Sequence, residues 1–543
     1  MSINITQKLD TLKSLESEVI SMSKTWENLA KKLDPFNPIV QNNCSNIVNT
    51  AAIESLSELV AYFLNYFTNY GSRPVKLKPK STLYDLDEGE NILTQDQIKI
   101  AEKVEKQIYQ ILQDYDTGIH QTVKSELVDM LIFSVGAFEI SADELYENVY
   151  LKHIPVNTIF FTQDKNCQID CVFRKITFTL HQLKTAFSKD ECSAILEAEN
   201  INEVDFDKDP NKTIELVQLI QERNIPNKED IKLQTKLNKK FGSYYIHEKS
   251  KQLIKEDGYD FMPIIIPRLE RRGNQKYGAS RPMIMEKIIM HLESLTQSVF
   301  RKDDLDMNPA FLMYFGDITQ RIDKIYPGQR VVLKNPAQSP VVQKLYVNDQ
   351  EMGNVQNSIM KLETTVRRMM FLNEINASPV FYDKDNQAKR DMTATEVKAR
   401  QDSAAMQLAA TALQIEKELF KPLIDTLVFI IKQREIIKTG GQGSDVSDSD
   451  YELEIGNIYR DIYLRHKQDK FNSIIINSQA IAGNLGNPNI LQNIDMDKLY
   501  RDAISLYDDT GDYLIDETTR DKQREMQAQA QANAMAQQQG QVQ

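Results

Sequence analysis

The feature that most constrains this chain is a helix start at Thr393, followed by a long apolar repeat. Thr393 and Glu396 have the spacing of a capping box, in which each side chain satisfies a free backbone N–H of the other residue. Forty-odd helical residues at about 1.5 Å per residue span on the order of 60 Å. The apolar positions of the repeat are Val397, Ala404, Leu408, Ala412, Ile415, Leu419, Leu423, Leu427 and Ile431.

Pro422 lies inside this long helix. Proline has no backbone N–H, and its ring clashes with the carbonyl four residues earlier, so we expect a helix kink near Glu418.

A charged segment, 376–392, precedes the helix. Its charges cannot be buried without a large free-energy penalty, which predicts an exposed loop. The candidate functional residues in this loop are Phe381, Tyr382, Asp383, Lys384, Asp385, Lys389 and Arg390.

The composition is that of a folded protein with several domains. The chain has 543 residues, of which 41% are apolar and 26% charged. No apolar run approaches the roughly 20 residues of a membrane-spanning helix, and the N-terminus lacks a signal-peptide pattern, which predicts intracellular synthesis. We expect free thiols, because no cysteine pair has the C-x-x-C spacing of a metal or redox site. The four cysteines are Cys44, Cys167, Cys171 and Cys192.

The net charge of −13 argues against a tight nucleic-acid binder. Such proteins usually carry a basic patch, because phosphate neutralisation dominates their affinity. Two interpretations of the acidic charge remain open. It keeps the protein soluble, or it lines a surface along which DNA slides without sticking.

The first 277 residues alternate between helical and strand patterns. Apolar steps predict four helices, near 9–29, 47–66, 97–116 and 122–135. Short β-rich runs between polar turns follow in 137–180, and strand patterns return near 244–247 and 264–266. Thr179 starts a short helix. Residues 188–230 are polar and are predicted to form a helical surface excursion. Residues 73–78 alternate like a strand.

Two helical patterns flank a segment rich in proline and glycine. The first, 277–299, carries an apolar stripe of Ile284, Ile288, Leu292 and Leu295. The second covers 355–372. The segment between them, 303–347, has short strand patterns and predicts a small α/β insert.

No motif predicts an enzyme. Residues 273–280 have P-loop glycine spacing but lack the lysine that grips phosphate, so a turn before a helix is the better interpretation. Asp303, Asp304 and Asp306 have no His or Glu cluster beside them, which favours a solvated turn over a metal site. The sequence therefore predicts no catalytic residue, no cofactor and no metal.

Several stretches occur in an order typical of one family. They are SVGAF (134–138), HIPV (153–156), NCQID (166–170) with Arg174 and Lys175, Gly258-Tyr259 with Pro263, Arg268, KYG (276–278), TATEV (393–397) and ELFKPLI (418–424). Together they resemble the podovirus-type head-to-tail connector, the portal protein of short-tailed bacteriophages. The resemblance spans roughly residues 20–435.

The resemblance implies an α+β, mainly helical portal fold with wing, stem, clip and crown regions. The implied divisions are the wing (1–277), the first stem helix (278–302), the clip (303–347), the second stem helix (348–375), the channel loop (376–392), a long kinked wing helix (393–439), a helical crown (440–525) and a Gln/Ala-rich tail (526–543). In connectors the segment before the TATEV-like helix projects into the channel. Lys384, Lys389 and Arg390 would then face passing DNA.

The implied function is that of a non-enzymatic subunit in a ring, expected to have twelve copies, at one capsid vertex of the virion. The ring would nucleate head assembly and pass double-stranded DNA non-specifically during packaging, retention and ejection. Its expected partners are the major capsid protein, the terminase large subunit and a tail adaptor, with no membrane. The chain would be made in the host cytoplasm. The alternative is an intracellular helical scaffold or adaptor without DNA passage.

Overall fold

A computed structural model describes residues 4–40, 47–68, 75–79, 95–143, 145–199, 212–223, 239–271, 273–314, 326–333, 342–344, 349–370, 380–382, 388–391, 408, 410–438 and 451–455. All of these belong to one compact unit, Met1–Thr68 with Val75–Ile455. Helices and small sheets are mixed along this unit, as the sequence predicts. None of its described helices combines the length and apolar character needed to cross a membrane.

Four helices precede the first large sheet. Their bounds are α1 (Ile5–Leu33), α2 (Ala51–Thr68), α3 (Gln95–Gln113) and α4 (Ile119–Phe133). The Asn4 side chain caps α1 by accepting from the Gln7 N–H, and the helix ends before the turn at Asp34. The predicted apolar stripe of α1 is buried from Leu9 to Leu29. α1 packs against α2, α4 and the later helix α8 (Arg281–Met307).

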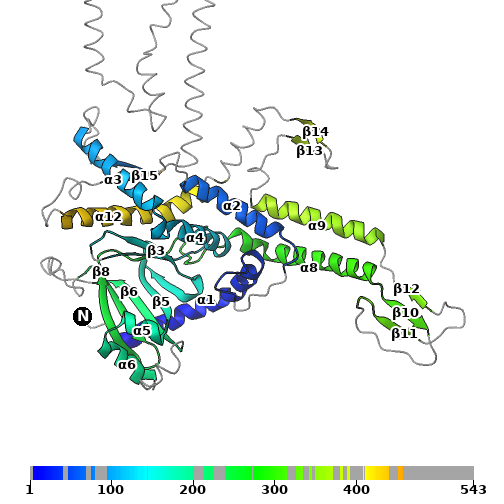
Figure 1. Ribbon diagram of the computed structural model, residues 1–543, viewed down its shortest axis with the longest axis horizontal. Helices are drawn as coiled ribbons and strands as arrows, with labels where there is room; N and C mark the ends of the chain where they lie inside the picture. The colour runs from blue at the N-terminus through cyan, green and yellow to red at the C-terminus, as the bar shows by residue number, and fades with distance from the viewer. Residues whose placement is uncertain are drawn as a thin grey trace, which may run out of the picture. The chain divides into compact units, whose positions relative to one another are not determined.

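A five-stranded antiparallel sheet has the order β4-β5-β6-β7-β8. The short helices α5 (Leu180–Ala186) and α6 (Lys189–Glu199) pack on it and enclose a core that includes Leu183, Ile195 and Leu216 (Figure 1). Thr179 starts α5 with a complete capping box, as the sequence predicts for the helix start. The strands are β4 (Ile159–Gln163), β5 (Ile169–Thr179), β6 (Thr213–Glu222), β7 (Phe241–His247) and β8 (Gln252–Tyr259).

The prediction of a helical excursion over 188–230 is wrong in its second half. Lys189–Glu199 is helical, but Thr213–Glu222 is β6, the middle strand of the sheet. Its residues from Leu216 to Ile220 are all buried. β5 and β7 pair with its two edges, and Ile214 and Leu216 pack in one core with residues of α5 and α6. The flanking residues are highly polar, and this led to the wrong prediction for the apolar run.

A smaller sheet has the order β3-β2-β9, with β2 (Phe138–Ala142), β3 (Val149–His153) and β9 (Ile264–Ile265). β2 follows α4 after a short turn, and an isolated antiparallel bridge joins Val135 to Arg268. This bridge extends the pairing of β2 and β9 toward the end of α4.

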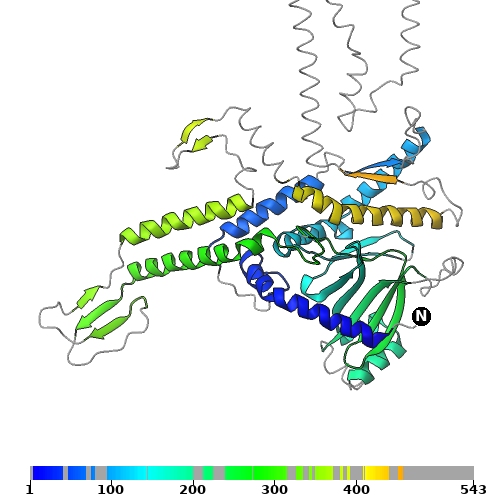
Figure 2. The same cartoon turned by 180° about the vertical axis from the view of Figure 1, so that it is seen from behind.

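Helices α8 and α9 (Asp349–Met369) lie side by side and run in opposite directions (Figures 1 and 2). Arg281 at the start of α8 donates from Nη1 to the Met369 carbonyl at the end of α9, at 3.0 Å. Between them in sequence lies a three-stranded sheet of order β11-β10-β12, made of β10 (Phe311–Tyr314), β11 (Arg330–Leu333) and β12 (Val342–Lys344).

Two expectations for α8 are wrong. Its buried face carries Met285, Ile289 and Leu292, whereas Ile284 is 59% exposed. The helix also continues through Asp303, Asp304 and Asp306, which were expected in a turn. Its last residue is Met307, five residues later than the predicted end of the stem helix at residue 302, and Asn308 is the C-cap.

The C-terminal described elements are short, apart from α12 (Lys421–Lys438). β13 (Val380–Tyr382) and β14 (Ala388–Asp391) form an antiparallel hairpin. β15 (Tyr451–Ile455) pairs with β1 (Val75–Pro79), which confirms the strand predicted near 73–78. These five residues lie within the expected helical crown, 440–525, and form a strand of the first unit. The rest of that expected region lies outside the described residues.

Candidate functional site

Motif stretches far apart in the sequence meet at the end of α4. We call this meeting point the junction, and it comprises residues 134–137, 164–168, 266–271, 276–280 and the turn 416–420. Ser134 ends α4 in a left-handed conformation with a φ of 63°. This reversal sends the chain directly into β2 and places segment 266–271 beside it.

Backbone hydrogen bonds tie the first segments of the junction together. The Leu269 N–H donates to the Ser134 carbonyl at 2.8 Å, and the Gly136 N–H donates to the Pro267 carbonyl at 3.0 Å. The Ser134 hydroxyl donates to the Leu269 carbonyl. These bonds satisfy polar groups that burial would otherwise leave unpaired.

Ser280 joins the end of α4 to the start of α8. Its hydroxyl donates to the Ile132 carbonyl in α4. The same oxygen accepts from the Met283 N–H at 3.3 Å and so caps α8. One side chain therefore fixes the end of one helix to the beginning of another.

Gly278 and Gly136 are required by close packing. A Cβ atom on Gly278 would lie within 3.0 Å of the Leu269 carbonyl and the Ser134 hydroxyl. A Cβ atom on Gly136 would lie within 3.0 Å of the Glu126 carboxyl group. These contacts explain physically why the SVGAF and KYG stretches contain glycine.

An aromatic cluster fills the apolar side of the junction. Trp26 of α1 lies 5.7 Å from Phe133 and 5.8 Å from Tyr277, measured between ring centroids. Tyr277 in turn lies 5.2 Å from Phe161 of β4. The cluster buries large rings from four separate parts of the chain, which supplies much of the packing free energy there.

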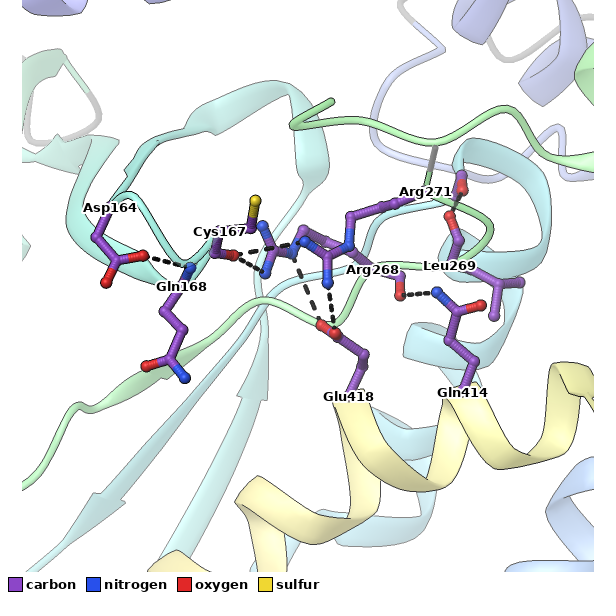
Figure 3. Close-up of polar contacts among 9 residues, drawn as sticks. Asp164, Cys167, Gln168, Arg268, Leu269, Arg271, Gln414 and Glu418 are labelled. Carbon is purple, nitrogen blue, oxygen red and sulfur yellow. Dashed lines mark hydrogen bonds and ion pairs between the residues drawn. The ribbon is translucent and has the colours of Figure 1, made fainter. Parts of the chain in front are cut away.

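Two arginines and one glutamate form the polar side of the junction (Figure 3). Glu418 accepts from Arg271 Nη2 at 2.9 Å and lies 3.7 Å from Arg268 Nε. The Cys167 carbonyl accepts from Arg268 Nη2 at 3.0 Å and from Arg271 Nη1 at 3.4 Å. The Arg268 guanidinium also stacks over the Phe161 ring at 5.7 Å.

The turn that presents the Cys167 carbonyl is held by Asp164. The Asp164 carboxylate accepts from the backbone N–H groups of Asn166 and Gln168, each at 2.8 Å. Cys167 itself has a φ of 61°, an uncommon conformation for a non-glycine residue. The NCQID stretch therefore forms a tight turn whose carbonyl serves both arginines.

Arg268 is only 4% exposed, so its charge depends on nearby partners. Burial lowers the pKa of its guanidinium, and the Glu418 carboxylate opposes that shift. Removing one partner of a buried ion pair is strongly destabilising, by about 3–5 kcal/mol. Glu418 therefore fixes its own helix to segment 266–271.

Glu418 lies in a π-helical turn, Glu416–Phe420, directly before α12. The Lys421 N–H donates to the Glu416 carbonyl, five residues back, and Pro422 follows. The widened turn accommodates the missing N–H of the proline and the clash of its ring. Gln414, one turn earlier, donates from Nε2 to the Arg268 carbonyl at 3.4 Å.

Comparison with known proteins identifies the family. A model of the family described as bacteriophage head to tail connecting protein matches residues 6–508. The chain belongs to this family. It is 20% identical over 333 residues to the portal protein of Salmonella phage epsilon15, a match that covers 59% of this chain. The match spans 55% of that relative's length.

Five of the ten predicted site residues of this connector-family chain lie within the described part. Phe381 and Tyr382 lie in β13, and Lys389 and Arg390 lie in β14, where Phe381 pairs with Arg390. A short hairpin thus occupies part of the expected channel loop. The predicted residues that lie outside the described ranges are Asp383, Lys384, Asp385, Thr393 and Glu396.

Pro422 is described, and the irregular π-helical turn lies at the position where the sequence predicts a kink. The bend of the whole 393–439 helix stays a prediction. Sequence reasoning missed the roles of Arg271 and Glu418. The available signal for this ion pair was a glutamate, Glu418, four residues before a proline inside a helix. The second part of the signal was a pair of arginines in another motif.

The described contacts of the junction are helix caps, backbone hydrogen bonds, an aromatic cluster and one group of ion pairs. Among the described residues, no group of three or more His, Cys, Asp or Glu side chains is placed to hold a metal ion. The described cysteines, Cys167, Cys171 and Cys192, are free thiols, as expected. The arrangement is that of a mechanical connection between helices and sheets.

Proposed function

We propose that this chain is a portal subunit that assembles into a ring, expected to have twelve copies, at one capsid vertex of a short-tailed phage. The observation that carries the proposal is the family match over residues 6–508. The ring would nucleate head assembly, pass DNA during packaging and ejection, retain it, and hold the tail. The chain would be part of the virion and would perform no covalent chemistry.

The arrangement of α8, α9 and the sheet between them supports this proposal. Helices of 27 and 21 residues span about 40 Å and about 32 Å. Asn49, in the segment before α2, donates to Thr296 of α8 at 3.2 Å and to Glu363 of α9 at 2.8 Å. Such a paired stalk with a terminal sheet suits the proposed stem, 278–302 and 348–375, and the proposed clip, 303–347.

The junction would give this assembly its mechanical continuity. It connects α4, α8 and the π-helical turn before α12 through the contacts of Ser280, Gly278 and Glu418. In the proposed portal, the helix over 393–439 follows the channel loop. The ion pair at Glu418 would then couple that helix, and with it the loop, to the wing.

The proposed partners follow from the ring position. They are the major capsid protein around the ring, the terminase large subunit during packaging, a tail adaptor afterwards, and double-stranded DNA bound without sequence preference. The net charge of −13 suits a channel that does not hold phosphate tightly. The proposed crown, 440–525, and tail, 526–543, lie almost wholly outside the described residues.

Imaging of the purified full-length chain by electron microscopy tests the proposal. We expect closed rings with a central hole, and sedimentation of a species far heavier than the 62.5 kDa subunit. Rings should also be recovered from disrupted virions. A strict monomer in both preparations contradicts the proposal. A large particle without a hole instead supports the helical scaffold alternative.

A further inference from the structure

Two carboxyl groups are fully enclosed beneath the end of α4. Glu126 is 0% exposed, and Asp129 lies one turn later on the same helix face. His153 of β3 approaches both, with Nε2 at 2.8 Å from Asp129 Oδ2 and 3.7 Å from Glu126 Oε1. Glu126 borders the junction at Gly136, but neither carboxyl group takes part in the hydrogen bonds and ion pairs described for the junction above.

Within the described part of the chain, Asp129 accepts hydrogen bonds from its neighbours, whereas Glu126 does not. Asp129 accepts from the Asn37 side chain at 3.0 Å and contacts the His153 ring. Neither oxygen of Glu126 has a hydrogen-bond partner among the described residues. A buried carboxylate without donors is very unfavourable, whereas a neutral carboxylic acid is tolerated. The geometry therefore assigns the negative charge to Asp129, opposite His153.

The surrounding charges favour the same assignment. Burial, and then the neighbouring Asp129, raise the pKa of Glu126 well above its ordinary value. The Ala137 N–H opposes the shift, although it makes no well-aligned hydrogen bond to this carboxyl group. Burial and Asp34 also raise the pKa of Asp129, but His153 and Asn37 oppose the shift. These groups come from α4 itself, from β3, from the turn after α1 and from the start of β2.

We propose that Glu126 holds a proton at neutral pH and that Glu126, Asp129 and His153 form an alkali-sensitive latch at the end of α4. Gly136 leaves the space that the neutral carboxyl group occupies. On ionisation, the Glu126 side chain must reach water, which requires α4 to separate from β2 and β3. The same movement would loosen Ser134 and, through it, the junction.

The direction of the pH effect follows from linkage. An acid whose pKa is higher in the folded state stabilises that state fully below its unfolded value, near 4.5. That stability is lost progressively as the pH rises from the unfolded value through the folded pKa. Between these two values, one proton changes the closed-to-open ratio by up to about tenfold per pH unit.

Hydrogen–deuterium exchange of the full-length chain tests the latch. After correction for intrinsic rates, peptides covering 119–137 should lose protection by up to about tenfold per pH unit above about pH 5. In Glu126→Gln, which cannot ionise, this loss should disappear. If the protection of these peptides falls equally with pH in the wild type and in the variant, the proposal is overturned.

Infrared spectroscopy of the wild type gives a test that needs no folded variant. At about pH 8, where an ordinary glutamate is ionised, the spectrum should contain a protonated carboxylic acid band that shifts with isotope-labelled glutamate. A band that follows labelled aspartate, or no band, refutes the assignment.

Glu293→Gln is the matched control for the infrared experiment. Glu293 is also buried, but it pairs with Lys32 at 3.1 Å and accepts from the Val48 and Asn49 N–H groups, each at 3.0 Å. Unlike Glu126, this carboxyl group has hydrogen-bond donors around it, so Glu293→Gln should keep the band. Glu126→Gln should lose it.

Discussion

At the scale of single residues, the junction depends on side chains that are small or that carry one well-placed polar group. Gly278 leaves space for a carbonyl, and Ser280 bridges two helices. Arg268 is buried and needs both Glu418 and the Cys167 carbonyl. These positions tolerate little change, because the groups around them are closely packed and already hydrogen-bonded.

Gly278→Ala should destabilise the folded chain strongly. The added methyl group would meet the Leu269 carbonyl, a backbone atom that cannot move without breaking its hydrogen bonds to the end of α4. Overpacking of this kind costs about 1–3 kcal/mol. Thermal or denaturant unfolding measures the loss.

Gly353→Ala is the matched control for that substitution. Gly353 is an exposed residue within α9, and a Cβ atom there meets nothing within 4 Å. Alanine should stabilise this helix by about 0.5–1 kcal/mol. Equal effects of the two substitutions would mean that the Gly278 contacts do not limit the fold.

At the scale of elements, the helix start at Thr179 and the buried stripe of α1 follow the sequence, whereas the buried face of α8 and the strand β6 do not. Thr179 starts α5 as predicted, and its capping box involves only four neighbouring residues. The buried face of α8 is displaced from the predicted stripe, and Ile284 is exposed. Periodicity identifies a helix, but its neighbours decide which of several apolar rows is buried.

The hairpin of β13 and β14 and the residues around it provide a test of the proposed channel loop. Changing Lys384, Lys389 and Arg390 to Ser should leave oligomer assembly intact, because the sequence predicts that these charges are exposed and exposed charges contribute little to stability. It should alter DNA packaging or retention, since cations near a channel axis interact with phosphate. Packaged DNA per assembled head is the quantity to measure in mutant phage.

A second triple variant controls for the change of total charge. Lys13, Lys24 and Lys165 are exposed residues of α1 and of the turn between β4 and β5. Changing these three to Ser removes the same charge at a distance in sequence from the loop. If both triples affect packaging equally, or if neither does, the loop is not the DNA-facing element. Failure of the first triple to assemble would make the loop a structural element.

At the scale of the whole molecule, α8, α9 and the sheet of β10, β11 and β12 form a separable substructure. Among the described strands, these three pair only with one another, α8 packs along α9, and the start of α8 bonds directly to the end of α9. Removing the sheet should therefore leave the two helices and the junction in place.

Replacing residues 309–347 with a short Gly/Ser linker tests the proposed clip. We expect ring assembly to persist, because the helices keep their contacts with α1, α2 and α4. Binding of the terminase large subunit or the tail adaptor should be lost. A co-purification assay with each partner measures this. Normal binding by the shortened chain would refute the assignment, and loss of the ring would assign the segment to subunit contacts.

The sequence by itself determined the local elements and, through the order of its motifs, the family. Apolar steps in α1, the capping box at Thr179 and the alternation at 75–79 are properties of neighbouring residues, so they could be read directly. The family-specific stretches could be recognised, but their roles could not.

Only the tertiary structure decided which distant residues meet. It paired β1 with β15 across more than 370 residues, placed β6 in the middle of a sheet, and brought Glu418 to Arg268 and Arg271. It also enclosed Glu126 and Asp129, which look like ordinary surface acids in the sequence. The physical reason is that hydrophobic periodicity and capping act over one or two turns, whereas burial and ion pairing depend on the packing of all neighbouring elements.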